Sequence, residues 1–529
     1  MASTKLAEET LYSSIIDAVA GICGDDNVLT GEEDRVFYGQ DVYERGAPPA
    51  LIARPGSVEE IVSIVRAARA ENMPVYVRGG GMSYTRAYLA DKDGAILLDI
   101  TRLNRIREVN IADGYVTVDA GVTWKQLETR LEAQGVRPVF WGPFSGGTAT
   151  IGGSMSQGSA TFGSGQVGTS ASTALGFEIV TAEGEILRTG MDGQPNHEPF
   201  FRPYGPDLTG LFTADAGALG IKTAVTLALE KRPNAVGGVS FSFTSFEAVH
   251  AALADAAATG LASELIAMDA TVAGIQAGQA NLTEDLKKLW AIVSSAHNPL
   301  RGAARGFKAA IAGRRVYNNA AFTAHFIAEG VSEKMLDAKL DALRRCGDAY
   351  GNEIPNAAIG VIRSNPFPDL PVTHFDGRRM LPISGIFPYS KVPAFEADYR
   401  AYVDSMKEQM TAAKVTLVDV FAGIGRNGML YEPVWYWEDS LEAFHEKMSP
   451  PGIIDSMPRY EENPEGRALV EQMRVAVIDL MFRHGAAHLQ IGRSYPYLRA
   501  RNGPAVDLLR TIKQRVDADG VINPDALGL

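Results

Sequence analysis

The sequence predicts an α+β protein of two large domains. The chain has 529 residues, of which 46% are hydrophobic, and this is more than a single hydrophobic core usually serves. The first part alternates strand and helix patterns in the manner of an α/β domain. Residues 233–238, Pro-Asn-Ala-Val-Gly-Gly, interrupt that pattern. From there to about residue 490 strands and helices alternate without any glycine-rich turn, which favours a separate domain with an antiparallel sheet and helices.

The first domain is expected to begin with a small helical segment over 10–48 and a short apolar strand over 51–55. Ser57 is a good N-cap, and the apolar residues after it follow helical spacing. The remaining elements, in chain order, are strands over 74–78, 95–100 and 115–120, a helix over 124–134, strands over 174–181 and 185–188, and a short helix, a turn at Gly220 and a strand within 211–228.

A glycine-rich turn, Arg78–Tyr84, directly follows a predicted buried strand. Consecutive glycines allow backbone N–H groups to converge on an anion that side chains would otherwise exclude. The turn matches neither the GxGxxG fingerprint nor the Gly-Lys-Ser/Thr phosphate loop. The turn is therefore interpreted either as a pyrophosphate site or as a tight structural turn.

A second glycine-rich segment covers residues 142–168, where nine of 27 residues are glycine and none is charged. A flexible linker of this length normally carries charge or is more purely Gly and Ser. We therefore expect an ordered loop packed against something flat and apolar. Two such segments, about 65 residues apart, suit a long dinucleotide that has a pyrophosphate and a flat ring.

Composition excludes several classes of protein. The net charge is −13 and no basic stripe is visible, so nucleic acid is not an expected partner. The short basic run 301–315 is interpreted as a solvated helix face or loop. Two distant cysteines, Cys23 and Cys346, argue against a disulfide framework. Because there is no apolar signal core and no run of 18 apolar residues, we expect a cytoplasmic protein without a membrane span.

Six motifs, in a fixed order, resemble the FAD-binding domain of the vanillyl-alcohol oxidase / p-cresol methylhydroxylase (PCMH) superfamily over roughly residues 50–230. They are Pro-Gly-Ser-Val-Glu-Glu-Ile-Val from 55, Val-Arg-Gly-Gly-Gly-Met-Ser-Tyr from 77, Leu-Leu-Asp-Ile-Thr-Arg-Leu-Asn-Arg-Ile from 97, Val-Asp-Ala-Gly-Val-Thr-Trp from 118, Ala-Thr-Ile-Gly-Gly from 149 and Gly-Ala-Leu-Gly-Ile from 217. The closing Asp-Gly-Val-Ile-Asn-Pro, from 519, is similar to the C-terminal signature of that family.

The resemblance implies a PCMH-type FAD-binding domain of two α/β subdomains at 1–235, a cap domain for the substrate at 236–494, and a C-terminal segment, 495–529, that packs back on the first domain. It implies that FAD is the cofactor, with the first loop on pyrophosphate and the second along the isoalloxazine and ribityl. The implied cofactor contacts are Val77, Arg78, Gly79, Gly80, Gly81, Met82, Ser83, Pro143, Thr148, Thr150, Ile151, Gly152, Gly153, Ser156, Gly158, Ser159, Gly220 and Ile221.

Within the superfamily, residues 188–191 and 200–212 resemble the oxidases and dehydrogenases of para-substituted phenols. That branch binds its substrate as phenolate and passes a hydride to flavin N5 through a quinone methide. The implied catalytic residues are Tyr84, Arg493, Tyr495 and Tyr497, although Gly492 precedes the arginine here and changes the order of the motif. The resemblance further implies a small lignin-type aromatic substrate, O₂ or an electron-transfer protein as acceptor, and a homodimer.

The flavin attachment departs from the family pattern. Ser156 stands where phenol oxidases keep an aspartate, and the stretch 421–431, where many members attach FAD covalently, has no histidine. We therefore expect noncovalent FAD, with Tyr431 as an outside candidate for attachment. The other candidates, which we interpret as structural histidines, are His374, His445, His484 and His488.

Two other functions remain open. A D-2-hydroxy-acid dehydrogenase of the same superfamily would bind a metal and a carboxylate. His484 and His488 have i, i+4 spacing, but HExxH is absent and no metal is expected. The arginines that could serve a carboxylate are Arg363, Arg378, Arg379 and Arg426, for which exposed charges are the simpler interpretation. The third candidate is a non-catalytic FAD-binding protein, which the missing loop aspartate would fit.

Overall fold

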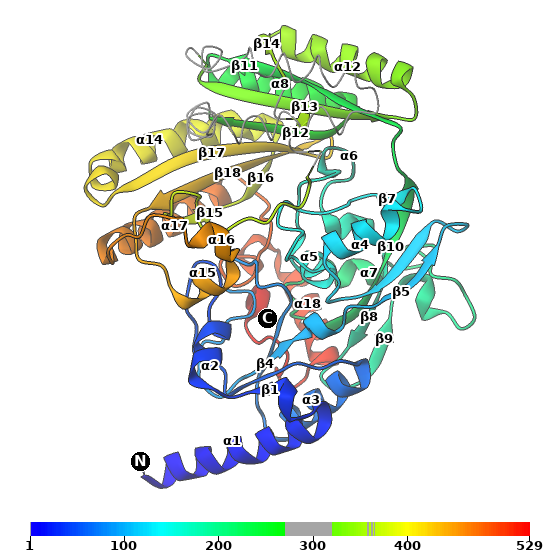
Figure 1. The fold of residues 1–529 in the computed structure, drawn as a ribbon, viewed down its shortest axis with the longest axis vertical. Coiled ribbons are helices and arrows are strands. Elements are labelled where there is room, and N and C mark those ends of the chain that lie inside the picture. The colour runs from blue at the N-terminus through cyan, green and yellow to red at the C-terminus, as the bar shows by residue number, and fades with distance from the viewer. Residues whose placement is uncertain (1, 270–319, 357–358, 361–362, 364) are drawn as a thin grey trace.

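The computed structural model describes residues 2–269, 320–356, 359–360, 363 and 365–529, and the side chains from residue 12 onward (Figure 1). The basic run 301–315 lies outside the described residues. The described chain forms three sheets, two in the N-terminal half and one in the cap (Figure 1).

The first subdomain is a four-stranded sheet of order β1-β2-β4-β3, in which β2, β4 and β3 are parallel. Its elements are α1 (Ala2–Cys23), β1 (Val28–Leu29), α2 (Glu32–Tyr38), β2 (Leu51–Ala53), α3 (Val58–Ala70), β3 (Val75–Arg78) and β4 (Ile96–Asp99). Ser57 caps α3 by accepting a hydrogen bond from the Glu60 amide, as the sequence predicts. Helix α3 packs in the core of this subdomain through the apolar spacing read from the sequence, and α1 contacts α3, β1 and β2.

The second subdomain is a six-stranded antiparallel sheet of order β5-β6-β10-β8-β9, with β7 also paired to β10. Its elements are β5 (Ile106–Asn110), β6 (Tyr115–Asp119), α4 (Trp124–Glu132), β7 (Val136–Pro138), α5 (Ile151–Gln157), α6 (Ser164–Val167), β8 (Ala174–Val180), β9 (Ile186–Arg188), α7 (Leu208–Leu211) and β10 (Ile221–Lys231).

The second glycine-rich segment is more regular than a loop, which corrects the sequence-based expectation. It contains α5 and α6, because Thr150 caps α5 and the glycines within α5 allow close packing. A Cβ on Gly152 would lie 2.6 Å from the side chain of Ala120. The segment is nevertheless ordered, with Phe162 stacked on Trp141 at 4.3 Å between ring centroids.

The cap contains an eight-stranded antiparallel sheet of order β14-β11-β13-β12-β17-β18-β15, with β16 also paired to β18. Its elements are β11 (Ala235–Phe243), α8 (Phe246–Thr259), β12 (Ala262–Asp269), β13 (Phe322–Gly330), α12 (Glu333–Asp348), β14 (Asn352–Ile354), β15 (Arg379–Pro382), β16 (Gly385–Pro388), α14 (Val392–Ala412), β17 (Val415–Ile424), β18 (Gly428–Trp437), α15 (Ala443–Met448), α16 (Pro451–Ile454) and α17 (Pro464–Arg483). Helix α6 of the second subdomain packs against β12 and β17, so the cap sheet lies over the N-terminal half (Figure 1).

After α18 (Gly503–Val516) the chain returns to the first subdomain. The Val75 amide donates to the Val521 carbonyl, and the Asn523 amide donates to the Val75 carbonyl, both at 2.8 Å. The C-terminal segment therefore lies beside β3, the strand that leads into the glycine-rich turn. The predicted fold class, with two N-terminal subdomains and a cap built on an antiparallel sheet, is confirmed. None of the helices described is long and apolar enough to cross a membrane.

Candidate functional site

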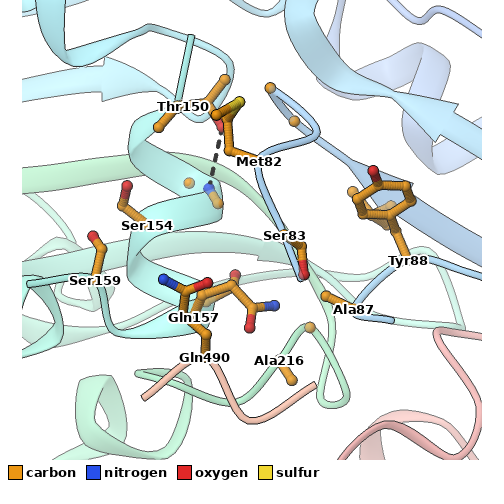
Figure 2. A pocket seen from close by; sticks show the side chains of 18 of the residues that line it. Met82, Ser83, Ala87, Tyr88, Thr150, Ser154, Gln157, Ser159, Ala216 and Gln490 are labelled. Atoms are coloured by element: carbon orange, nitrogen blue, oxygen red, sulfur yellow. Dashed lines mark hydrogen bonds between the residues drawn. The ribbon is translucent and has the colours of Figure 1, made fainter. Parts of the chain in front are cut away.

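A cavity with about 970 Å³ of empty space, including its open mouth, lies where the two glycine-rich segments meet (Figure 2). One wall is the turn 79–83 and the opposite wall is α5. Residues 216–217 and 220–222, Gln490 and Asn523 also line it. The cavity thus collects segments from both subdomains and from the C-terminal part of the chain.

The turn needs glycine because it packs directly on the residues before α5. A Cβ on Gly79 would lie 2.2 Å from the Thr150 hydroxyl oxygen, and a Cβ on Gly80 would lie 2.0 Å from the Thr148 carbonyl oxygen. Gly81 adopts a φ of +74°, which also favours glycine. The Thr150 hydroxyl accepts a hydrogen bond from the Gly153 amide at 3.3 Å (Figure 2). The bare backbone on both walls leaves room for a pyrophosphate, which fits the anion cradle predicted from the sequence.

Two glutamines line the cavity at the C-terminal end of α5. The side chains of Gln157 and Gln490 lie next to one another there (Figure 2). The backbone N–H of Gln490 donates a hydrogen bond to the backbone carbonyl of Gln157 at 2.8 Å. The side-chain oxygen Oε1 of Gln157 is buried and has no hydrogen-bond partner among the described residues. A flat ring with N–H donors on its edge would satisfy this oxygen, so the residues present fit a flavin.

Of the 18 cofactor contacts predicted from sequence, 14 line the cavity: Val77, Gly79, Gly80, Gly81, Met82, Ser83, Pro143, Thr150, Gly152, Gly153, Ser156, Ser159, Gly220 and Ile221. Arg78 does not, because its guanidinium lies over the rings of Tyr38 and Phe37 at 4.9 and 5.4 Å.

The other three predicted contacts outside the lining have structural reasons for their positions. Thr148 touches Gly80 through its backbone. Ile151 is fully buried in the core of the second subdomain. Gly158 ends α5 in the left-handed conformation, with a φ of +71°.

Sequence reasoning missed several lining residues. Gln157 and Ser154 lie within the glycine-rich segment 142–168, and this position could have indicated that they line the cofactor cavity. Asn523 belongs to the C-terminal motif that begins at residue 519, which was the available signal, whereas Gln490 carries no local signal and reaches the cavity only through the tertiary fold.

Arg493 does not line the cavity, and its hydrogen bonds favour a structural role over the predicted catalytic one. Both terminal nitrogens of its guanidinium are engaged. Nη1 donates to the Arg86 carbonyl at 2.7 Å and to the Ala87 carbonyl at 3.4 Å. Nη2 donates to Oδ1 of Asn523 at 2.9 Å and to the Pro524 carbonyl at 2.5 Å. These four bonds use every hydrogen on the two terminal nitrogens.

Tyr495 and Tyr497 also lie outside the lining of the cavity. The Tyr495 hydroxyl accepts a hydrogen bond from the Ser384 amide at 2.9 Å, and its ring stacks on His488 at 4.2 Å between centroids. Tyr497 packs beside the guanidinium of Arg501 at 4.6 Å. Both tyrosines therefore have packing partners that account for their positions.

Tyr84, directly after the turn, reaches toward the cap. Two groups on β18 of the cap, Glu432 and Tyr436, act electrostatically on its hydroxyl. Burial, with the negative charge of Glu432, raises the pKa of the Tyr84 hydroxyl above its usual range. Burial likewise raises the pKa of Tyr436 to about 12. Both phenols are therefore neutral hydrogen-bond donors near pH 7.

The candidates for covalent flavin attachment and for metal binding have other partners. Tyr431 is fully buried and donates to the carboxylate of Glu396 on α14. His484 pairs with Asp398 at 2.8 Å, whereas Nδ1 of His488 contacts the Ser384 carbonyl at 3.0 Å.

His374 pairs with Asp376 at 2.7 Å, and Nδ1 of His445 accepts a hydrogen bond from the Glu442 amide. Within the described ranges, no group of three or more His, Cys, Asp or Glu side chains is placed to hold a metal ion.

Three of the four arginines considered for a carboxylate are paired. Arg363 bonds to Glu264 and Glu329, Arg378 to Asp376, and Arg379 to Asp439 and Glu442. Arg426 lies against the backbone of Gly260.

Comparisons with known proteins agree with this geometry. Residues 49–190 match the family model described as an FAD binding domain. An uncharacterized FAD-linked oxidoreductase of Mycobacterium tuberculosis is 30% identical over 248 residues, which are 46% of this chain and 52% of that protein. The mitochondrial D-lactate dehydrogenase [cytochrome] of Arabidopsis thaliana is 28% identical over 40% of this chain and 36% of its own length. The chain spans about half the length, or less, of these curated relatives.

Among solved structures, p-cresol methylhydroxylase with substrate bound superposes with a TM-score of 0.72 at 17% identity, covering 98% of this chain and 97% of that one. At this identity the likeness concerns the fold. In agreement with the resemblance stated from the sequence, the chain has the fold of p-cresol methylhydroxylase, and residues 49–190 match an FAD-binding domain. Its cofactor is FAD.

Proposed function

We propose that this protein is an FAD-dependent oxidoreductase that oxidises a para-substituted phenol or phenolic alcohol. The observation that carries the proposal is the glycine-lined cavity, whose turn 79–83 is followed directly by Tyr84, a neutral phenol that has Glu432 and Tyr436 of the cap as electrostatic neighbours. When bound, FAD supplies the hydride acceptor. The relative from Mycobacterium tuberculosis, named an FAD-linked oxidoreductase, supports the redox class.

The cofactor would lie along the cavity with its pyrophosphate against the turn 79–83. Gln157 and Gln490 would hold the polar edge of the flavin ring at the other end of α5. No protein atom is required to bond covalently to the flavin, so we propose noncovalent FAD. The remaining face of the ring would then look toward Tyr84 and the cap.

The charge pattern of the cap side favours a phenol over a carboxylic acid. A carboxylate substrate needs an unpaired cation, whereas Arg363, Arg378 and Arg379 already bind protein carboxylates. A neutral hydroxyl needs hydrogen-bond donors and acceptors, which Tyr84 and Tyr436 supply. The second candidate is a D-2-hydroxy-acid dehydrogenase, which is favoured by the sequence similarity to a D-lactate dehydrogenase.

Anaerobic bleaching of the flavin tests the proposal. The FAD-loaded protein is mixed with a series of 4-alkylphenols, 4-hydroxybenzyl alcohols and D-2-hydroxy acids, and the flavin absorbance is followed. We expect the phenols to bleach it and the acids to leave it unchanged. Bleaching by D-2-hydroxy acids alone would establish the second candidate, and bleaching by neither class would favour a non-catalytic flavoprotein.

Reoxidation identifies the electron acceptor. We propose O₂ or an electron-transfer protein for this role. Admitting air to the phenol-reduced protein should restore the flavin colour within seconds if O₂ is the acceptor. Colour that returns only on adding an artificial one-electron acceptor indicates an electron-transfer partner.

A further inference from the structure

Glu432 on β18 faces the flavin domain. Side chains two residues apart on a strand share a face, and Leu430 packs with Leu489 and Ala160. Ala160 lines the cofactor cavity. Tyr431, on the other face of β18, packs on α14. The carboxyl of Glu432 is therefore directed toward the flavin side of the cap sheet.

Three polar groups with spare hydrogen-bonding capacity gather at this point. The Ser384 hydroxyl donates to Oε2 of Glu432 at 2.5 Å, and Oε1 receives no hydrogen bond from any described residue. The hydroxyls of Tyr84 and Tyr436, both electrostatic neighbours of Glu432, also make no hydrogen bond within the described part of the chain. Burial raises the pKa of Glu432, and the Ser384 hydrogen bond opposes this rise.

Among the described residues, no cation acts on Glu432, because the Ser384 hydrogen bond is the one interaction that lowers the pKa of its carboxyl. Arg378, which lies over the ring of Tyr436 at 5.4 Å, is paired with Asp376. Arg474, the cation nearest to Tyr495, is paired with Glu471. Arg493, the expected partner of a phenolate, is bound to main-chain carbonyls. A phenolate formed here without a proton acceptor would add a buried negative charge at considerable cost.

Resting on the proposed function, we propose that Glu432 accepts the hydroxyl proton of the substrate phenol, in place of stabilisation by an arginine. The phenol O–H bond breaks and the proton moves to Oε1 of Glu432, which becomes a neutral carboxylic acid. The electron pair left on oxygen conjugates into the ring as the para benzylic C–H bond breaks. With FAD bound, the cofactor would supply the two-electron oxidant that accepts the hydride, and the substrate would become a quinone methide.

This transfer keeps the net charge of the site constant, because one negative charge moves from the carboxylate to the phenol oxygen. Phenols ionise with a pKa of about 10, and carboxyls in water with a pKa near 4.3. A raised pKa of the Glu432 carboxyl reduces the pKa difference between the phenol and the carboxyl, and the free-energy cost of the proton transfer falls with it. Hydrogen bonds from Tyr84 and Tyr436 to the phenol oxygen would reduce this difference further.

The test compares the anaerobic rate of flavin reduction by a 4-alkylphenol across pH for the wild type and Glu432→Gln, with FAD bound to both. Wild type should lose activity at low pH as Glu432 becomes protonated. Glu432→Gln should be slower by about a hundredfold and should gain rate with rising pH, since only phenol that ionises unaided reacts. Ring-fluorinated phenols, which ionise more easily, should recover part of the loss. Glu438→Gln, at a carboxyl paired with Lys414 beyond the end of β18, is the matched control.

The outcomes separate the two proposals. If no phenol reduces the wild-type flavin, the proposed function is refuted and this inference falls with it. If phenols reduce the wild type and Glu432→Gln keeps the same rate and pH profile, only the role of Glu432 is refuted. Should Glu432→Gln lose FAD, Ser384→Ala serves instead. Removing the hydrogen bond should move the acidic limb of the wild-type profile to higher pH, and an unmoved limb would overturn the inference.

Discussion

Replacing Arg493 by methionine separates a structural role from a substrate-binding one. The substitution keeps an unbranched apolar stem and removes the guanidinium with its four donated hydrogen bonds, three of them at 2.9 Å or shorter. Hydrogen bonds from a charged donor contribute about 1.5–3 kcal/mol each. Part of this lost free energy is recovered in the variant, because water can solvate some of the carbonyls and no guanidinium has to be buried. We expect a net loss of about 3–5 kcal/mol in the free energy of unfolding.

The corresponding change in melting temperature follows from the size of the chain. An unfolding entropy of about 2.1 cal/mol/K per residue over 529 residues is roughly 1.1 kcal/mol/K. The expected fall in Tm is therefore about 3–5 °C, measured by scanning calorimetry on the FAD-loaded protein. Arg501→Met is the control, since Arg501 is exposed and its guanidinium lies over the ring of Tyr497. An unchanged Tm, together with a tenfold or greater loss of phenol affinity, would refute the structural role of Arg493.

Three further outcomes are expected. Gly80→Ala should weaken FAD binding roughly ten- to a hundredfold in equilibrium titrations, because its Cβ would lie 2.0 Å from the Thr148 carbonyl oxygen and relieving such a contact costs about 1–3 kcal/mol. The control Gly147→Ala, whose new Cβ would have no atom closer than 3.8 Å, should bind FAD as the wild type does. Gln157→Leu removes the buried hydrogen-bond acceptor Oε1, so the affinity for FAD should fall about two- to tenfold and the reduction potential of the flavin should shift. An unaltered potential and affinity would show that Oε1 of Gln157 does not touch the flavin ring. Burial lowers the pKa of His325 to about 4, below its unfolded value near 6.5, so the contribution of the neutral imidazole to stability is complete above pH 6.5 and is lost as the pH falls toward 4. In His325→Asn the decline in Tm over this pH interval should be shallower. An equally steep decline would show that other groups cause the loss of stability in acid.

The sequence predicted those parts of the cofactor site that depend on local backbone. Consecutive glycines after a buried strand leave few conformations, and the turn 79–83 lies where this pattern places it. The helices α5 and α6 were hidden by their composition, since glycine and serine are poor helix formers. Thr150 as N-cap and the close packing on Ala120 override that weak propensity.

The predicted substrate residues depended on tertiary contacts that one sequence does not reveal. Arg493 stands near the family's Tyr-Arg position, but its guanidinium meets the carbonyls of Arg86 and Ala87, which are 407 and 406 residues away along the chain, and the carbonyl of Pro524, which is 31 residues away. Glu432 gave no signal, because an alternating strand contains many polar residues and only the register of the cap sheet decides which of them face the flavin.

The pairing of the C-terminal segment with β3 makes the cofactor domain discontinuous in the chain. Val75 is held between Val521 and Asn523, and Asn523 itself lines the cavity. An excised fragment 1–235 would lack this support, so a domain graft has to carry the terminal segment as well. Since FAD binds only the assembled site, each tenfold excess of FAD over its dissociation constant adds about 1.4 kcal/mol to the folded state. Bound FAD would therefore stabilise the association of the C-terminal segment with the first subdomain. Release of the flavin would report the dissociation of that segment from β3 during unfolding.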